Sequence, residues 1–254
     1  MCGTAGQGPL MTLAQRKKAL EIAVDQAKRR VPVIAQVGLP DTQSTIELAV
    51  HAEDHDATAL ACVTPYYYKL DRNSMIGHYE AIASSVSIPV FVYNIPRLTG
   101  FNVDVTLLKQ LASVKGVVGI KDSSRDLAQL MEFRSSLPKD FDVINGADSL
   151  ILSTLLFGLE AAISASANAF PELFVELFSL YQQGRIAEAV ERQNLITSLR
   201  TTIGEPPVPS VHEALKMRGI DSGSVKRPMR KLTPEERARL QNALKQFGLL
   251  KRNQ

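Results

Sequence analysis

The sequence predicts an α/β fold built on a parallel sheet. Short runs rich in Val, Ile and Ala recur along the chain without the alternation of apolar and polar residues that half-exposed strands show, so we interpret them as strands buried on both faces. From Val37 to Gly146 their carboxyl ends follow one another at intervals of 25 to 29 residues, the length of a strand and a helix together. The predicted strands are residues 31–38, 58–65, 88–96, 116–122, 141–148 and 161–166.

Amphipathic segments separate these strands, as repeated strand–helix units require. Residues 42–57 and 73–86 are two such segments. Thr12 and Gln15 fit a capping box, which marks the start of a helix. After Phe170 the pattern is helical to the end of the chain.

Two observations favour a closed barrel over an open sheet that binds a nucleotide. The only glycine-rich turn, residues 3–9, does not match G-x-G-x-x-G and follows no predicted strand. Polar residues gather instead at the carboxyl ends of several different strands, as they do in TIM barrels. These residues are Tyr67, Tyr93, Lys121, Gly146 and Asp148. We therefore predict a (β/α)8 TIM barrel with a C-terminal helical extension.

Six predicted strands are two fewer than such a barrel needs. We expect the first strand–helix–strand segment to be missing from this chain, through a start assigned too late, a truncated chain or a naturally short protein. We also expect a chain that begins at residue 1 to be poorly stable. The predicted domains are residues 1–169, a barrel incomplete at its N-terminus, and residues 170–254, the last barrel helix with the helical extension.

Composition and charge exclude several classes of protein. The net charge of +3 is small, and the basic stretches 16–18, 28–30 and 226–231 form no continuous stripe with interleaved aromatic residues, so we predict no nucleic-acid partner. No apolar run approaches the ~20 residues of a membrane span, and no signal peptide opens the chain. Cys2 and Cys62 lack any metal-binding or disulfide spacing. We predict a cytoplasmic protein without a membrane partner.

The four histidines give a weak metal signal. His51, His55, His78 and His212 all lie in helix-like segments away from the strand ends, and we expect them at the surface. His51 and His55 are four residues apart, which is a spacing that metal pairs use, but the sequence shows no carboxylate partner for them. We therefore predict no metal site.

Lys121 ends a predicted buried strand, and two interpretations of it are open. As an isolated strand-end lysine it reaches solvent or pairs with Asp122. Alternatively, the barrel mouth desolvates the side chain and favours a neutral amine, which attacks a carbonyl as a Schiff-base lysine. Tyr93 ends the preceding strand and should lie beside Lys121, where its hydroxyl either stays in water or transfers protons during the reaction.

The sequence resembles the N-acetylneuraminate lyase and dihydrodipicolinate synthase superfamily in five segments. In chain order these are GTAGQGPLMTLAQRKKAL, TPYYY, YNIPRLTG, GIKDSS and NGADS. The resemblance runs from Gly3 to about Leu232 and covers nearly the whole chain. Members of this superfamily are class I pyruvate-dependent aldolases and related lyases built on a TIM barrel, so the resemblance implies the same fold and chemistry.

The resemblance implies a role for each matching residue. Lys121 matches the Schiff-base lysine and Tyr93 the general acid/base tyrosine. Thr4 matches a hydroxyl residue that relays protons to that tyrosine, and Tyr67 matches a tyrosine that completes the relay from across a dimer interface. The backbone N–H groups of Thr4 and Ala5 are expected to hold the pyruvate carboxylate.

Further substrate contacts follow from the same resemblance. Ile163 matches a residue that lines the pyruvate pocket through its backbone. Gly146, Asp148 and Ser149 lie where sugar-acid lyases contact substrate hydroxyls. A polar turn that caps the next helix explains Asp148 and Ser149 equally well.

Three departures from the family pattern bear on the substrate. Ala5 stands where the family has a second threonine, and Gln7 stands where it has a glutamate, which removes a negative charge behind the turn. Dihydrodipicolinate synthases carry an arginine at the position of Leu98, whereas this chain has Arg97 one residue earlier. A shift of one residue aims the guanidinium elsewhere, although Arg97 stays a candidate substrate contact.

Our leading hypothesis is a pyruvate-dependent aldolase or lyase that cleaves or forms a 2-keto-3-deoxy sugar acid or a similar hydroxy-2-oxo acid. Its partners would be pyruvate and a small aldehyde or 2-oxo acid, and the resemblance implies no metal or organic cofactor. One alternative is dihydrodipicolinate synthase, which condenses pyruvate with aspartate semialdehyde, or a related dehydratase. Another is a non-catalytic, truncated barrel paralogue. The resemblance also implies a homotetramer built as a dimer of dimers.

Overall fold

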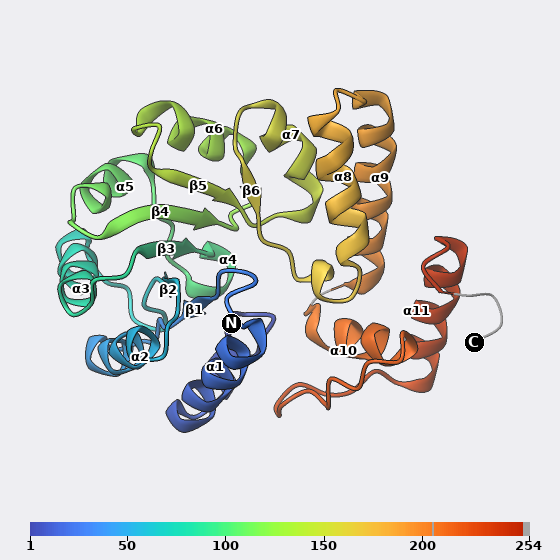
Figure 1. Cartoon of the computed structure of the whole chain (residues 1–254), viewed down its shortest axis with the longest axis horizontal. Helices are drawn as coiled ribbons and strands as arrows, with labels where there is room; N and C mark the ends of the chain where they lie inside the picture. The colour runs from blue at the N-terminus through green and yellow to red at the C-terminus, as the bar shows by residue number, and fades with distance from the viewer. Residues whose placement is uncertain (205, 251–254) are drawn as a thin grey trace. The chain divides into compact units, whose positions relative to one another are not determined.

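The computed structural model describes residues 1–204 and 206–250, and six strands in these residues form one sheet (Figure 1). The strands are β1 (Ile34–Gln36), β2 (Ala59–Val63), β3 (Val90–Asn94), β4 (Val117–Asp122), β5 (Asp142–Asn145) and β6 (Ala161–Ala162). Their spatial order equals their chain order, and each pair from β1 to β5 is parallel. Every predicted strand contains one of them, so the α/β prediction is confirmed. The closed eight-stranded barrel stays a prediction.

Side-chain caps start the helices that follow the strands. The helices are α1 (Leu13–Ala27), α2 (Thr42–Asp54), α3 (Arg72–Ser84), α4 (Pro96–Thr99), α5 (Val105–Ala112) and α6 (Leu127–Ser136). Thr12 forms the predicted capping box with Gln15. An aspartate one residue before each of α2, α3, α5 and α6 accepts a hydrogen bond from a backbone N–H in the first turn. The turns after the strands therefore carry the signals that begin the helices.

The chain divides into two compact units. The first contains residues 1–146 and 157–161, and in it the helices α2, α3, α5 and α6 lie along the outside of the sheet (Figure 1). The second contains residues 147–156 and the described residues from 162 onward.

A buried arginine fixes α1 to the end of β1. Arg16 is 3% exposed, and its guanidinium donates to the Gln36 Oε1 at 2.6 Å and to the Gly38 carbonyl oxygen at 3.5 Å. Met1 runs beside β1 as a strand residue would, because its amino group donates to the Ile34 oxygen and its oxygen accepts from the Gln36 N–H. These contacts hold Met1 along β1 and α1 at the carboxyl end of that strand.

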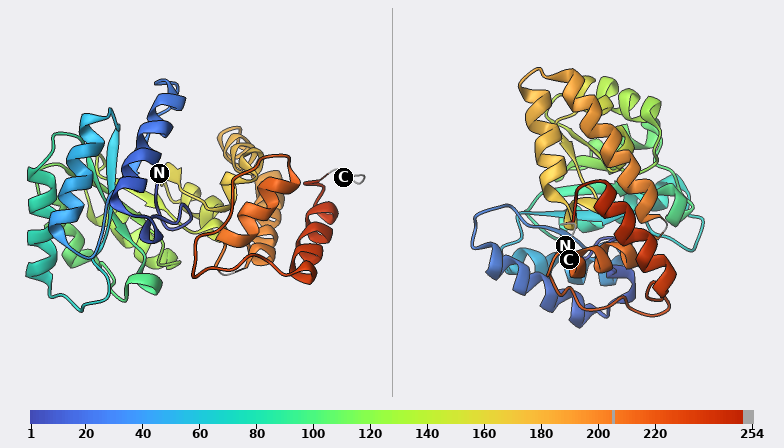
Figure 2. Two further views of the ribbon diagram at one scale, coloured as in Figure 1. Left: turned by 90° about the horizontal axis from the view of Figure 1, so that it is seen from below. Right: turned by 90° about the vertical axis from the view of Figure 1, so that its right-hand side faces the viewer.

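The second unit is helical, as predicted for the chain after Phe170. It contains η2 (Asp148–Leu150), α7 (Ile151–Leu156), η3 (Ser166–Asn168), α8 (Pro171–Gln182), α9 (Ile186–Ile203), α10 (Val208–Met217) and α11 (Pro234–Gln246). Helices α8 and α9 lie side by side (Figure 2). One apolar cluster joins the helices, and Leu177, Leu199 and Leu244 are fully buried within it. Among the described residues, no helix combines the length and the apolar character needed to cross a membrane.

The prediction that the histidines lie at the surface is wrong for His78. This residue is 5% exposed, because it lies on the face of α3 that packs on the sheet. Its Nδ1 is 2.9 Å from the Thr42 Oγ1, and its Nε2 is 3.7 Å from the Cys62 Sγ. Burial lowers the pKa of His78 from 6.5 to about 4, although Asp41 acts in the opposite direction.

We expect His78 to make folding sensitive to acid. The folded state keeps its ring neutral down to a pKa of about 4, whereas the unfolded chain binds a proton near pH 6.5. The contribution of His78 is therefore complete above pH 6.5 and is lost as the pH falls toward 4, by about 3 kcal/mol in total. Urea unfolding at several pH values should show a smaller acid loss in His78→Gln than in the unchanged chain. Equal losses would contradict the prediction.

Candidate active site

The strand register places Tyr93 and Lys121 side by side. Tyr93 on β3 is the direct partner of Lys121 on β4, and Asn94 is the partner of Asp122 one position later. Because successive side chains of a strand point to opposite faces, Tyr93 and Lys121 share one face, and Asn94 and Asp122 share the other. The Lys121 Nζ lies 4.0 Å from the centroid of the Tyr93 ring. The predicted neighbourhood of these two side chains is confirmed.

Asp122 is not the partner of Lys121. It is fully buried, and its carboxylate accepts hydrogen bonds from the Asn94 Nδ2 at 2.6 Å, from the Gln129 Nε2 at 3.2 Å and from the Ser124 hydroxyl. Burial raises the pKa of Asp122, and these donors oppose that rise. The alternative in which Lys121 pairs with Asp122 is therefore not supported by the geometry.

A tight turn at the start of the chain brings Thr4 to Tyr93. The Gln7 N–H donates to the Thr4 oxygen at 3.2 Å, and the Gly8 N–H donates to the Gly3 oxygen at 3.2 Å. Gly8 is required here, because a Cβ on it would lie 1.8 Å from the Cys2 oxygen. The turn places the Thr4 Oγ1 3.1 Å from the Tyr93 hydroxyl oxygen. Thr4, Tyr93 and Lys121 therefore form one connected group.

Gly146 leaves room for the stem of Lys121. It follows β5, and its N–H donates to the Asp122 carbonyl oxygen at 2.7 Å. A Cβ at this position would lie 3.0 Å from the Lys121 Cε and 2.0 Å from the Ser123 Oγ. Gly146 therefore contacts the group through its backbone, and a side chain there would displace the lysine.

The tyrosines that follow β2 point in different directions. Tyr66 is half-buried and packs against Val63, Tyr93 and Ile95. Tyr67 is 87% exposed and has a φ of 84°, which is an unfavourable backbone conformation for an aromatic residue. Its ring meets the Tyr68 ring edge-on, with 5.1 Å between the centroids. The chain itself therefore does not bring Tyr67 into the group, and its expected contact across a dimer interface stays a prediction.

The remaining predicted residues of the first unit lie around the turn and α4. Ala5 is half-buried in the turn beside Thr4. Arg97 is exposed on α4, and Leu98 on the same helix is 51% exposed. Adjacent residues of a helix point about 100° apart, so the Arg97 side chain does not take the direction of Leu98.

Asp148, Ser149 and Ile163 belong to the second unit. Asp148 begins η2 and is buried, and its carboxylate accepts a hydrogen bond from the Ser166 hydroxyl at 2.7 Å. This contact joins η2 to η3, and no side chain caps η2, so the alternative in which Asp148 belongs to a capping turn also stays a prediction. Ser149 follows it in η2, and Ile163 lies just after β6 with 40% of its surface exposed. Their predicted substrate contacts stay predictions.

Sequence reasoning missed the buried pair formed by Asn94 and Asp122. The signal was present, because each of these polar residues directly follows a predicted site residue at the end of its strand. The pair ties the ends of β3 and β4 together behind Tyr93 and Lys121. It therefore holds the two site residues in register.

Comparison with known proteins gives a family match over most of the chain. The model of the dihydrodipicolinate synthetase family matches residues 1–247. An uncharacterized DapA-like lyase of Halobacterium salinarum is 37% identical over 98% of this chain and 82% of its own length. A 4-hydroxy-tetrahydrodipicolinate synthase of Acetivibrio thermocellus is 34% identical over 98% of this chain and 85% of its own length.

Solved structures give the same match in three dimensions. YagE, a prophage protein of E. coli K12 that belongs to the dihydrodipicolinic acid synthase family and was solved in complex with pyruvate, superposes with a TM-score of 0.94 at 32% identity. The match covers 98% of this chain and 86% of YagE. CdNal of Clostridium difficile, solved in complex with mannosamine, gives a TM-score of 0.92 at 27% identity over 96% of this chain and 84% of its own.

Proposed function

The chain belongs to the dihydrodipicolinate synthetase family, and on that premise we propose that it is a class I pyruvate-dependent lyase whose Schiff-base residue is Lys121. One observation carries the proposal: the Lys121 Nζ lies over the Tyr93 ring, and the Tyr93 hydroxyl is 3.1 Å from the Thr4 hydroxyl. An amine next to a connected pair of hydroxyl groups is the arrangement that imine formation with proton transfer needs.

The first half of the proposed reaction is imine formation. The neutral Lys121 amine attacks the C2 ketone of the substrate and forms a carbinolamine. Tyr93 gives a proton to the C2 hydroxyl of the carbinolamine, and this oxygen then leaves as water. The product is a protonated imine between the Lys121 Nζ and C2, which withdraws electrons from the neighbouring carbons.

The second half is cleavage of the bond between C3 and C4. The C4 hydroxyl gives its proton to the Tyr93 oxygen, which lost its own proton in the first half. The hydrogen bond with Thr4 stabilises that oxygen, and Thr4 passes a proton along the relay only as it takes up another. The electron pair of the broken bond moves toward the imine, so the aldehyde leaves and an enamine stays on Lys121. Tyr93 then gives a proton to C3, water attacks the imine carbon, and the proton that this water loses returns to Tyr93 as pyruvate leaves and the amine is restored. The condensation reaction is the reverse of these steps.

The turn around Thr4 offers a site for the substrate carboxylate. Gln7 and Gly8 close this turn through their own N–H groups, so it does not consume the N–H groups of Thr4 and Ala5. We assign these two donors to the carboxylate, since backbone N–H groups in a tight turn form a concave anion site. The loss of the second threonine at Ala5 leaves the backbone donor unchanged.

Tyr67 supports an oligomer in which one copy completes the site of another. Its backbone has a positive φ, its ring is 87% exposed, and the ring contact reported above is with Tyr68, which is also exposed, so the conformation presents Tyr67 outward. We assign Tyr67 to the proton relay of a second copy, in the homotetramer that the family resemblance implies. Sedimentation velocity that detects only monomers would contradict this assignment.

Leu98 and Arg97 favour a hydroxylated substrate over aspartate semialdehyde. The family resemblance implies an arginine at this position in dihydrodipicolinate synthases, whereas this chain has the apolar Leu98. Arg97 is the adjacent residue of α4, and its side chain points in another direction. We therefore propose a 2-keto-3-deoxy sugar acid or a similar hydroxy-2-oxo acid as the substrate. The second candidate, condensation of pyruvate with aspartate semialdehyde, is favoured by relatives such as the Acetivibrio thermocellus synthase.

A pair of assays tests the substrate class. One follows release of pyruvate from a panel of 2-keto-3-deoxy sugar acids, and the other follows loss of aspartate semialdehyde in the presence of pyruvate. We expect pyruvate release from at least one sugar acid with a higher kcat/KM than the condensation, and no release by Lys121→Ala. Condensation alone would identify a synthase. Activity in neither assay, in a folded sample, would support the non-catalytic alternative.

A further inference from the structure

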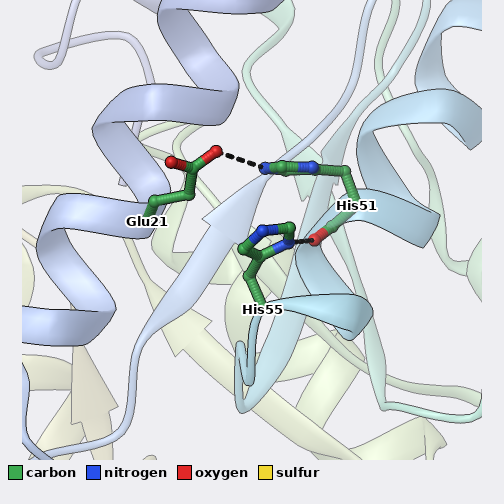
Figure 3. A group of neighbouring side chains, drawn as sticks. All are labelled: Glu21, His51 and His55. Carbon is green, nitrogen blue, oxygen red and sulfur yellow. Dashed lines mark hydrogen bonds and ion pairs between the residues drawn. The ribbon is translucent and has the colours of Figure 1, made fainter.

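Helices α1 and α2 bring three metal-ligating side chains together on the first unit (Figure 3). Glu21 lies on α1, His51 lies in the last turn of α2, and His55 is the residue that caps α2. Each offers one ligand atom, and these atoms all lie within 4.8 Å of one another. The carboxylate partner that the sequence did not show for the two histidines is therefore Glu21, which comes from the neighbouring helix.

Helix geometry aligns the two histidines. Residues four apart lie on the same face of a helix, one turn above the other. The His51 and His55 rings accordingly stack, with 4.0 Å between their centroids and 31° between their planes. Both rings therefore lie on the same side of α2, next to Glu21.

A backbone hydrogen bond prepares His55 for coordination. Its Nδ1 lies 2.9 Å from the His51 carbonyl oxygen, and a carbonyl oxygen only accepts, so Nδ1 carries the proton. The lone pair of the neutral ring is then on Nε2, the nitrogen on the Glu21 side of the ring in Figure 3. Histidines that bind metals usually donate their other N–H to a carbonyl or carboxylate in this way.

The His51 Nε2 faces the Glu21 carboxylate at an ion-pair distance (Figure 3). The His51 Nε2 is buried and has no hydrogen-bond partner among the described residues. It lies 3.5 Å from the Glu21 Oε1, beyond good hydrogen-bond distance. Four ligands placed tetrahedrally about 2.0–2.1 Å from a zinc ion lie roughly 3.3 Å from one another, so the observed separation fits a shared ion.

The two lysines nearest the group on α1 leave one oxygen of Glu21 toward His51. Lys18 donates to the Glu21 Oε2 at 3.0 Å, so Oε1 is the oxygen of this carboxylate that faces His51. Lys17, the other nearby cation on α1, is engaged with Glu47 at 2.7 Å.

We propose that Glu21, His51 and His55 bind one divalent transition-metal ion of the zinc class. This ion links α1 to α2. Two imidazoles and one carboxylate select Zn²⁺ and its neighbours over Mg²⁺ or Ca²⁺, which prefer oxygen ligands only. Three protein ligands leave a fourth tetrahedral position for water. The ion takes no part in the proposed lyase reaction, so a negative result for one proposal does not affect the other.

Zinc titration of the full chain tests this inference. The chain is prepared without an affinity tag, stripped with EDTA and titrated with Zn²⁺ by calorimetry, and its melting temperature is measured with and without Zn²⁺. We expect one ion per chain and a higher melting temperature with Zn²⁺. Glu21→Gln, His51→Ala and His55→Ala should each weaken binding by about 10-fold or more and abolish the thermal shift.

Two controls separate this site from other ligands. His212→Ala removes a histidine elsewhere in the chain and should bind Zn²⁺ as the unchanged chain does. Substitution of Zn²⁺ by Co²⁺ should give a spectrum without thiolate charge-transfer bands, since Cys2 and Cys62 are buried and take no part. The absence of saturable binding, or binding that survives all three substitutions, would overturn the proposal. Glu21 and His55 are accessible at the surface, so their variants should fold.

Discussion

Lys121→Ala is expected to lower turnover by about 10⁴-fold or more, since removal of a covalent nucleophile deletes the whole route through the intermediate. The methyl group of alanine cannot attack the ketone, so neither the imine nor the enamine forms. Lys121→Arg should be equally inactive, because a guanidinium keeps its charge and does not act as the amine. Steady-state assays measure the turnover of each variant on the substrate that the unchanged chain uses best.

Lys115→Ala is the matched control for Lys121. Lys115 is exposed and lies just before β4, at the other end of the strand that carries Lys121. We expect this variant to keep full activity. Circular dichroism should show that Lys121→Ala is folded, because the side chain is only half-buried and its neighbour Asp122 keeps its own hydrogen bonds. A folded Lys121→Ala with more than a tenth of normal turnover would rule out the proposed nucleophile.

Tyr93→Phe is expected to lower kcat by 10²- to 10⁴-fold, roughly the contribution of a well-placed general acid or base. Phenylalanine keeps the ring under the Lys121 Nζ but removes the hydroxyl that lies 3.1 Å from Thr4. Substrate binding should change little, so the loss should appear in kcat more than in KM. Stopped-flow and steady-state kinetics measure the two parameters.

A double-mutant cycle with Thr4 tests whether the two hydroxyl groups act together. Thr4→Val alone should lower kcat, since Tyr93 loses its hydrogen-bond partner. Added to Tyr93→Phe it should have little further effect, because the relay is already broken. Tyr68→Phe removes an exposed hydroxyl and serves as the control. Additive effects of Thr4→Val and Tyr93→Phe would contradict a shared relay.

The sequence was sufficient for the sheet and for the central pair of the site. Strand ends are signalled by β-branched runs that stop at polar residues, and parallel neighbours with equal repeat lengths come into register. Tyr93 and Lys121 end two consecutive runs, so their contact follows from the repeat alone. Thr4 was placed by the family resemblance, and the turn that holds it depends on Gly8.

Contacts between distant elements were beyond such reasoning. The burial of His78 depends on which face of α3 meets the sheet, and that helix shows little segregation of apolar residues. Asp122 looked like a partner of Lys121 because the two are adjacent, whereas the strand alternation sends them to opposite faces. Glu21 lies 30 residues or more before His51 and His55 in the sequence. Only the packing of α1 on α2 brings the three side chains together.

The central claim is a covalent imine on Lys121, and borohydride trapping tests it most directly. The chain is incubated with pyruvate and sodium borohydride, which reduces an imine to a stable amine, and is then analysed by intact and peptide mass spectrometry. We predict one reduced pyruvyl adduct on the peptide that contains Lys121, and no adduct in Lys121→Ala. A folded sample that forms no adduct, or forms it on another lysine, would contradict the account.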